Sequence, residues 1–218
     1  MKILTVLKCG GEYNEGHVQW ITRQLTDCEV SCLTDSTMPD DDFKGVTGAK
    51  KLPLYYGAWG ARGWWAKMEM FRPDLHGDFL YVDLDTVFLR TPKSFDGLSG
   101  PCVLADFYFP QTSVGSGLMY LPESCRGPIW ENWERFPHDH IARNHGDQDF
   151  LTPLLWPAER WQNKFPYNVV SYKAHLSKED GQQFYKGGYD DMSQISVVCF
   201  HGKPRPWEVQ HKHGWIPR

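Results

Sequence analysis

Several features that would assign a sequence to a common class of protein are missing from this 218-residue chain. No apolar run approaches the roughly 20 residues that a membrane-spanning helix requires, so we expect no transmembrane segment. The six cysteines include no Cys-x-x-Cys pair, which excludes the usual zinc-knuckle and thioredoxin-like motifs. The formal net charge is −4, whereas general nucleic-acid binders carry a basic excess. The sequence therefore favours a globular protein of another class.

We also expect the first residues to form a β-strand and not a secretory signal. Its apolar run reaches only from Ile3 to Leu7 and ends at Lys8, which is too short for the central region of a signal peptide. The cysteines lie in or beside apolar runs, as buried free thiols do. We therefore expect a cytoplasmic protein.

Internal repeats, low-complexity tracts and linkers are absent from the sequence as well, which predicts one domain over residues 1–218. The chain opens with a strand over 2–7, a helix containing Val18 and Ile21, and a strand over 29–33. A β-α-β start of this kind is typical of an α/β fold with a parallel sheet.

The apolar pattern continues to alternate along the chain. Further strands are predicted over 78–82, 102–105, 118–121, 168–172 and 195–200. Helices are predicted over 62–71, 128–136 and 148–155. Residues 35–60 and the tail from residue 203 are predicted to be irregular, because Gly, Pro and Asp are frequent in the first and Pro in the second.

Two acidic residues, Asp83 and Asp85, interrupt the apolar run from Phe79 to Leu89. Side chains two positions apart on a strand share a face, so we expect the two carboxylates to point the same way. Such a pair in apolar surroundings is costly unless a cation lies between them. Their hard oxygen atoms suit Mg²⁺ or Mn²⁺, with a diphosphate completing the coordination. An edge strand that turns both aspartates to water is the alternative.

Two further polar clusters follow the aspartate pair. Gly146-Asp147-Gln148-Asp149 stands at the predicted start of a helix, where acidic residues either favour the helix dipole or belong to a ligand site at the carboxyl edge of the sheet. His201 leaves an apolar strand and is followed by Gly202, Lys203 and Arg205. Imidazole is a good ligand for Mn²⁺, and the two basic residues could neutralise a diphosphate. A hydrogen-bonded surface histidine is the alternative.

In this order, the three clusters resemble the GT-A glycosyltransferases, and most closely family 8, which includes glycogenin and bacterial lipopolysaccharide galactosyltransferases. The resemblance runs from Lys2 to Trp207 and includes Leu33-Thr34-Asp35, Gly63-Trp64-Trp65-Ala66-Lys67, Ser116-Gly117-Leu118-Met119 and Phe200-His201-Gly202-Lys203-Pro204. It implies a single GT-A domain, with a Rossmann-like, mixed but mostly parallel sheet flanked by helices. It also implies sugar transfer from a nucleotide-diphosphate donor, a UDP-sugar, with Mn²⁺ or Mg²⁺ as cofactor and retention of anomeric configuration.

The resemblance further implies roles for residues at matching positions. The metal ligands would be Asp83, Asp85 and His201. The residues beside the reacting sugar carbon would be Asp147, Gln148 and Asp149. The donor would be bound by Cys9, Gly10, Tyr13, Asp35, Lys67, Asp106, Ser116 and Lys203, with Arg205 as the alternative to Lys203. Residues 1–90 would form the nucleotide-binding half, residues 91–202 the half for sugar and acceptor, and residues 203–218 a C-terminal tail.

Two other functions fit parts of the sequence. Asp83-Leu84-Asp85-Thr86-Val87 also resembles the nucleophile motif of haloacid-dehalogenase-type phosphatases, although that motif normally lies on the first strand of its fold. The ten Trp, ten Tyr and twelve Phe would suit a non-catalytic carbohydrate-binding module. Residues 36–60, where the acceptor region is expected, match no known motif, so the acceptor is open: it is a glycan, a lipid-linked molecule, a protein or a modified nucleic acid.

Overall fold

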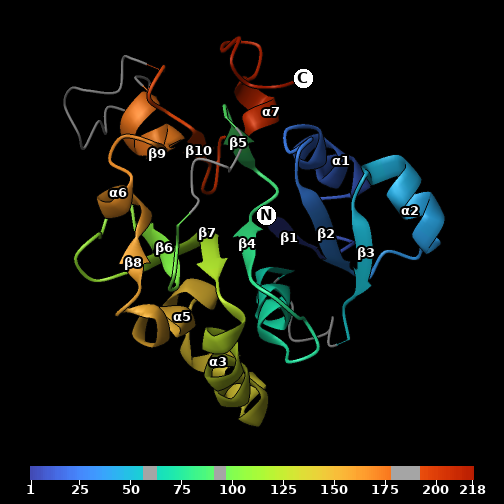
Figure 1. Ribbon diagram of the computed structural model, residues 1–218, viewed down its shortest axis with the longest axis vertical. Coiled ribbons are helices and arrows are strands. Elements are labelled where there is room, and N and C mark those ends of the chain that lie inside the picture. The colour runs from blue at the N-terminus through green and yellow to red at the C-terminus, as the bar shows by residue number, and fades with distance from the viewer. Residues whose placement is uncertain (56–62, 91–96, 178–191) are drawn as a thin grey trace.

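Two β-sheets organise the computed structural model, which describes residues 1–55, 63–90, 97–177 and 192–218 (Figure 1). The strands of the larger sheet are β1 (Lys2–Leu7), β2 (Glu29–Thr34), β3 (Lys50–Pro53), β4 (Phe79–Val82), β6 (Cys102–Ala105), β7 (Val114–Leu121) and β8 (Glu159–Arg160). Those of the smaller sheet are β5 (Thr86–Phe88), β9 (Val169–Ser171) and β10 (Val197–Cys199). Within the described residues, the strand orders are β3-β2-β1-β4-β7-β6-β8 and β5-β10-β9.

The larger sheet is mixed but mostly parallel. β1 runs parallel to β2 and β4, β2 runs parallel to β3, and β6 runs parallel to β8. β7 is antiparallel to both of its neighbours, β4 and β6. The first two strands are joined by helix α1 (Glu15–Arg23), which gives the predicted β-α-β start. The predicted α/β class is confirmed.

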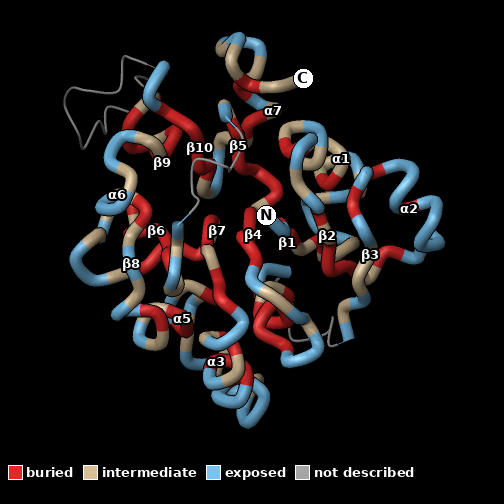
Figure 2. The backbone as a smooth tube through the Cα atoms, in the orientation of Figure 1, coloured by how far each residue is buried: buried red, intermediate tan, exposed pale blue. Residues whose placement is uncertain are grey.

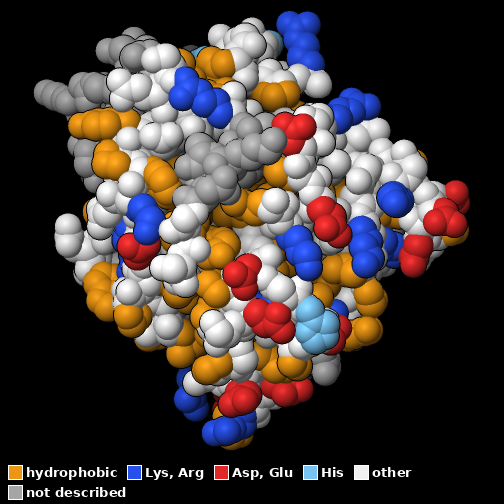
Figure 3. All heavy atoms as spheres, in the orientation of Figure 1, with side chains coloured by type: hydrophobic (Ala, Val, Ile, Leu, Met, Phe, Trp, Pro, Cys, Tyr) orange, Lys and Arg blue, Asp and Glu red, His pale blue; other side chains and the backbone are white. Residues whose placement is uncertain are grey.

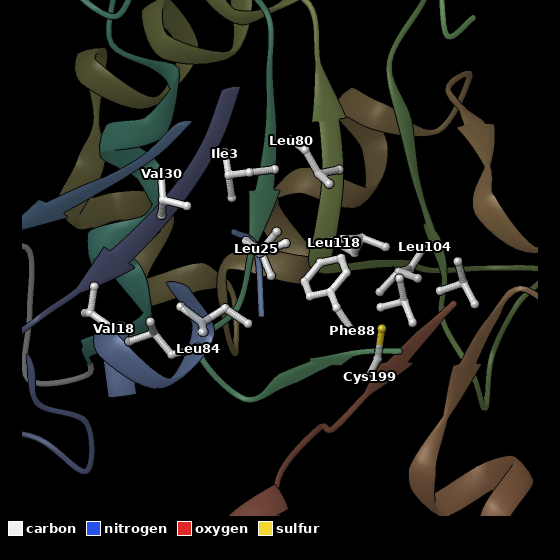
Figure 4. Close-up of a cluster of buried hydrophobic side chains, with 14 of the residues drawn as sticks. Ile3, Val18, Leu25, Val30, Leu80, Leu84, Phe88, Leu104, Leu118 and Cys199 are labelled. Atoms are coloured by element: carbon white, nitrogen blue, oxygen red, sulfur yellow. The ribbon is translucent and has the colours of Figure 1, made fainter. Parts of the chain in front are cut away.

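Helices cover both faces of this sheet. Alternate residues of a strand point to opposite faces, and in the central strands both sets are mostly apolar, so both faces are buried by packing against helices. On β4, Leu80 and Val82 join a core cluster that includes residues of α1 and α2 (Asp40–Thr47), part of which Figure 4 shows. Phe79 and Tyr81 join the opposite cluster, which includes residues of the 3₁₀ helix η1 (Gly63–Phe71) and of α3 (Glu123–Arg135) and α5 (Asp147–Leu155). Figure 2 shows that the buried residues concentrate in the central strands.

The remaining described helices are short: α4 (Pro137–Arg143), α6 (Trp161–Lys164), a π-helical turn (Tyr172–Leu176) and α7 (Pro206–Val209). None of the helices in the described ranges combines the length and the apolar character needed to cross a lipid bilayer.

The start of α1 fixes the loop that follows β1. The amide of Gly16 donates to Oδ1 of Asn14 at 3.0 Å, and the amide of Asn14 donates to Nδ1 of His17 at 3.0 Å. This reciprocal cap satisfies amide groups that a helix start would otherwise leave unpaired. The ring of the capping residue His17 also contacts the ring of Tyr13, at a centroid distance of 5.4 Å.

The segment from Asp83 to Asp85 joins the two sheets. β4 ends at Val82 in the larger sheet and β5 begins at Thr86 in the smaller one. The amide of Thr86 donates to the carbonyl oxygen of Asp83 at 3.2 Å, which closes a turn. The two aspartates therefore lie in a turn and not on a strand, so the predicted reason for their alignment is wrong, although both side chains line the same pocket.

Two segments predicted to be irregular contain regular structure. Within residues 35–60, α2 and β3 are formed, because Phe43 and Thr47 bury a helix face and β3 pairs with β2; residues 56–60 lie outside the described part. The tail forms α7, and its Val209 and Ile216 pack in a core cluster with the smaller sheet. Figure 1 shows α7 beyond β5, on the side of α1.

Helix boundaries also differ from prediction. α3 begins at Glu123, five residues before Pro128, so this proline lies inside the helix and removes one backbone donor there. The predicted helix at 62–71 is a 3₁₀ helix from Gly63, and residue 62 lies outside the described part. The sequence pattern of η1 did not distinguish the two helix types.

Candidate functional site

A pocket of about 700 Å³ lies where the two sheets meet. Its lining comes from the loop after β1, from η1, from the β4–β5 turn, from the end of β6 and the loop after it, from β7, from the start of α5 and from the segment after β10. Ten predicted site residues line it: Tyr13, Lys67, Asp83, Asp85, Asp106, Ser116, Asp147, Gln148, Asp149 and His201. The other four, Cys9, Gly10, Asp35 and Lys203, are not among its lining residues. Acidic and basic side chains lie close together over the middle of one face of the molecule (Figure 3).

Asp83 is fixed by a backbone hydrogen bond and by two contacts of its carboxylate. Its amide donates to the carbonyl oxygen of Gly117 on β7 at 2.9 Å. The hydroxyl of Tyr81 donates to Oδ1 at 2.6 Å, and Nζ of Lys67 lies 2.8 Å from the same oxygen. A Cβ atom at position 117 would lie 3.1 Å from Oδ2 of Asp83. Glycine at this position therefore leaves the room that the carboxylate occupies.

Asp85 is only 3% exposed. Its Oδ2 accepts hydrogen bonds from the Tyr13 hydroxyl at 3.0 Å and from Nη1 of Arg205. Burial, followed by repulsion from Asp83, raises the pKa of Asp85 to about 6, although the attraction of Arg205 opposes the rise. The negative charge of Asp85 at neutral pH is therefore costly, and a further cation would stabilise it.

Lys67 lies between two carboxylates that come from distant parts of the chain. Besides its ion pair with Asp83, its Nζ lies 3.6 Å from Oδ2 of Asp147, which also accepts a hydrogen bond from Ser116 Oγ at 2.7 Å. Burial disfavours the charge of Lys67, but attraction by Asp147 and Asp83 outweighs burial and raises its pKa above the ordinary value. Lys67 therefore stays positively charged in the pocket.

Gln148 is oriented by Asp106. Oδ1 of Asp106 accepts from the amides of Tyr108 and Phe109, both at 2.8 Å, which fixes the carboxylate. Its Oδ2 then accepts from Nε2 of Gln148 at 2.7 Å. Asp149 instead accepts from the amide of His145 at 3.0 Å, so it also stabilises the start of α5.

His201 shares the pocket with the aspartate pair. Its Nε2 lies 2.6 Å from Oγ of Ser171, and its ring stacks on Phe107 at a centroid distance of 5.5 Å. Burial, followed by the charge of Lys173, lowers the pKa of His201 to about 4, so its imidazole is neutral at pH 7. Among the residues that the structure describes, no three His, Cys, Asp or Glu side chains converge closely enough to hold a metal ion. Metal binding by His201 stays a prediction.

The predicted base-binding segment lies beside the pocket. Asp35, at the end of β2, accepts from the amide of Cys9 at 2.7 Å and forms an ion pair with Lys8. Gly10 has a φ angle of +83°, a left-handed conformation that side chains disfavour. These contacts hold the loop after β1, whose Lys8 and Tyr13 line the pocket.

Of the two basic residues considered for the diphosphate, Arg205 is the one that reaches the pocket. The Arg205 side chain is 16% exposed and contacts Asp85 and Glu12. The Lys203 side chain is 65% exposed, and its Nζ lies 2.5 Å from Glu208 and 3.2 Å from Glu12. Lys203 therefore pairs with two carboxylates at the surface, Glu208 outside the pocket and Glu12 in its lining, while its own side chain is not part of the lining.

Sequence reasoning missed two residues that support the site. Tyr81 lies two positions before Asp83, and the spacing of strand residues could have indicated it. Glu12 had no comparable signal, because its partner Arg205 is 193 positions away in the sequence.

Comparison with known proteins identifies the fold. No family model matches the sequence, and no curated protein matches it. The glycosyltransferase GlyE from Streptococcus pneumoniae TIGR4 superposes with a TM-score of 0.66 and 12% identity, over 94% of this chain but only 55% of GlyE. The galactosyltransferase LgtC, solved in complex with donor and acceptor sugar analogs, superposes with a TM-score of 0.65 and 11% identity, over 95% of this chain and 89% of LgtC. Mouse xyloside xylosyltransferase 1 gives a TM-score of 0.52 and 12% identity, over 93% and 98% of the two chains.

The chain has the GT-A fold of the glycosyltransferases, as its motifs predicted. At these identities the likeness concerns the fold, and activity has to be argued from the site. Asp83 follows the fourth strand of the chain, whereas the nucleophile of the phosphatase alternative would follow the first strand. The fold therefore gives that alternative no support.

Proposed function

We propose that this protein transfers a glycosyl group from a UDP-sugar to an acceptor, with a divalent cation held by Asp83 and Asp85. The observation that carries the proposal is the acidic turn at the junction of the two sheets, inside a pocket with an excess of acidic side chains. The acidic lining residues are Glu12, Asp83, Asp85, Asp106, Asp147 and Asp149, and the basic ones are Lys8, Lys67 and Arg205. A diphosphate is itself anionic, so its binding in this pocket requires added positive charge.

The donor atoms of the turn suit Mn²⁺ or Mg²⁺. Both side chains offer hard carboxylate oxygens, and burial together with repulsion from Asp83 raises the pKa of Asp85, a cost that a cation would relieve. When bound, the ion would neutralise charge that develops on the departing nucleoside diphosphate. We propose His201 as a third protein ligand, because its neutral imidazole lines the same pocket.

Basic residues of the chain would hold the rest of the donor. We assign the diphosphate contact to Arg205 in place of Lys203, since a planar guanidinium at the pocket wall can donate to two phosphate oxygens. Lys67 would contact the donor near its sugar and phosphates. Residues 1–90, with the loop of Cys9, Gly10 and Tyr13 tied to Asp35, would bind the nucleotide, and Asp106 and Ser116 of the second half, residues 91–202, would contact the sugar.

Retention is the stereochemistry that the polar contacts support. In the transfer, the bond between the anomeric carbon and a diphosphate oxygen breaks and its electron pair leaves with the nucleoside diphosphate. The acceptor hydroxyl forms the new bond to the anomeric carbon and gives its proton to the departing diphosphate oxygen. Inversion would call for a carboxylate available as a base. Asp147 is engaged by Lys67 and Ser116, and Asp149 by the amide of His145. We therefore place Gln148 beside the anomeric carbon, framed by these two aspartates.

A thermal-shift panel tests the proposal. Nucleoside diphosphates and sugar nucleotides are added with and without Mn²⁺, and a ligand at 100 times its Kd should stabilise the protein by about 2.7 kcal/mol. We expect stabilisation by UDP compounds only when Mn²⁺ is present, and its loss in Asp83→Asn. Equal stabilisation of that variant would remove the metal assignment. For any transfer observed, the anomeric proton signal of the product distinguishes retention from inversion.

A further inference from the structure

The guanidinium of Arg205 divides its contacts between two carboxylates on opposite sides of it. Nε lies 3.1 Å from Oε1 of Glu12 and Nη2 lies 2.9 Å from Oε2, which is a bidentate ion pair. The third nitrogen, Nη1, donates to Oδ2 of Asp85. The guanidinium also lies over the ring of Tyr13, 5.2 Å from its centroid. Arg205 therefore has a firm attachment to Glu12 and a single contact with Asp85.

We propose that Arg205 and the divalent cation compete for Asp85, so that this side chain couples cation binding to donor binding. The inference rests on the proposed function, in which Asp85 is a cation ligand. The oxygen that Arg205 contacts is on a carboxylate with only 3% of its residue surface exposed, so few other approaches to it are open. Two positive groups on this carboxylate would also repel each other.

In this scheme, binding of the donor releases Asp85 from Arg205. A diphosphate offers Nη1 a new anionic partner, while Glu12 keeps its two hydrogen bonds and acts as a pivot. Asp85 is then available to the cation, which itself binds the same diphosphate. Cation and donor therefore bind with positive cooperativity, and each should bind weakly without the other.

Removing the guanidinium should consequently have opposite effects on two affinities. In Arg205→Gln without nucleotide, we expect Mn²⁺ to bind about tenfold more tightly than in the wild type, because a hydrogen bond to a charged group no longer competes. With Mn²⁺ saturating, we expect UDP to bind about tenfold more weakly, because a charge-assisted contact is lost. Electron paramagnetic resonance of free Mn²⁺ measures the first affinity, and calorimetric titration with UDP measures the second.

Lys203→Gln is the matched control. It removes the same charge, and Lys203 is also a partner of Glu12, but its side chain is not among the pocket residues. We expect its Mn²⁺ affinity to stay within about twofold of the wild type, since exposed charges are well screened. If both variants gain Mn²⁺ affinity equally, general electrostatics explains the effect and the competition is refuted.

A conservative variant protects the test against misfolding. Arg205→Lys keeps the positive charge, but one ammonium group cannot form the bidentate pair with Glu12 while a third nitrogen contacts Asp85. We expect a smaller gain in Mn²⁺ affinity than in Arg205→Gln. Wild-type affinity for Mn²⁺ in both variants would overturn the competition alone. No detectable Mn²⁺ binding in any of the proteins, even with UDP, would overturn the proposed cation site as well.

Discussion

Replacing Asp85 with Asn should stabilise the folded protein while abolishing transfer. The pKa of Asp85 is raised from 3.8 to about 6, mainly by burial and then by Asp83. At pH 7.5 the charged form therefore costs the folded state about 3 kcal/mol relative to the neutral form, at 1.36 kcal/mol per pKa unit. Asn is neutral and of similar shape, so the variant avoids this cost. Its uncharged acceptor weakens the hydrogen bonds from Tyr13 and Arg205, which offsets part of the gain, and we expect a net increase of about 1 to 3 kcal/mol in the free energy of unfolding.

The pH dependence has a definite sign. A carboxyl group with a raised pKa in the folded state stabilises the protein when protonated, and this contribution is lost as the pH rises from about 4 through 6. The advantage of Asp85→Asn should therefore fall to about half at pH 5. Adding Mn²⁺ and UDP at pH 7.5 should stabilise the wild type and not the variant.

Urea denaturation at pH 7.5 and pH 5 measures these differences. Glu131→Gln, which removes one acidic charge from the exposed surface of α3, is the control and should change stability by less than about 0.5 kcal/mol. A variant Asp85→Asn that is less stable than the wild type at pH 7.5 would refute the reasoning. In that case the ion pair with Arg205 would outweigh burial and the repulsion from Asp83.

Three further outcomes follow from the site and the sheets. His201→Ala should raise the Mn²⁺ concentration needed for half-maximal activity; since the pKa of His201 is about 4, protonation of His201 itself should not alter the wild-type requirement between pH 6 and 8, and superimposable Mn²⁺ titrations of the two proteins at pH 8 would contradict metal ligation. Gln148→Glu should lower kcat, because it places a second carboxylate against Asp106. In the double variant with Asp106→Asn this repulsion is absent, so part of the lost kcat should return, as steady-state kinetics would measure. Gly115→Ala should lower Tm by several degrees, as calorimetry would measure, because the added Cβ would lie 2.9 Å from Cβ of Leu104. Such overpacking costs about 1 to 3 kcal/mol of stability.

The sequence predicted the fold well where apolar periodicity decides the structure. β1, α1, β2 and β4 lie close to their predicted positions, because their buried residues follow the periods of a strand or a helix. α2 was missed since three consecutive aspartates at its start resemble a loop, yet they favour the positive end of a helix dipole. The missed helix shows that local composition alone cannot tell a helix start from a loop.

Most of the site residues predicted from the sequence line the pocket, but the contacts that orient them were not predicted. Asp83 and Asp85 were identified by their charge within an apolar run, but the turn that orients them depends on β5 joining the smaller sheet. Whether Lys203 or Arg205 reaches the pocket was undecided in the sequence, because both follow β10 within a few residues. Arg205 is held at the pocket by its contacts with Glu12 and Asp85, which lie 193 and 120 positions from it in the sequence. Contacts across such separations leave no local pattern.

The same separations determine when the site is complete during synthesis. In the part of the chain that the structure describes, every strand of the larger sheet lies before residue 161, so this sheet can form while the chain is still being made. At about 5 to 20 residues per second, Arg205 is added roughly 6 to 24 s after Asp85. A nascent chain therefore carries the acidic turn for many seconds without its guanidinium partner. The lining of the pocket is complete only when β10 has paired with β5 and β9 and the segment after it has brought His201 and Arg205 to the pocket.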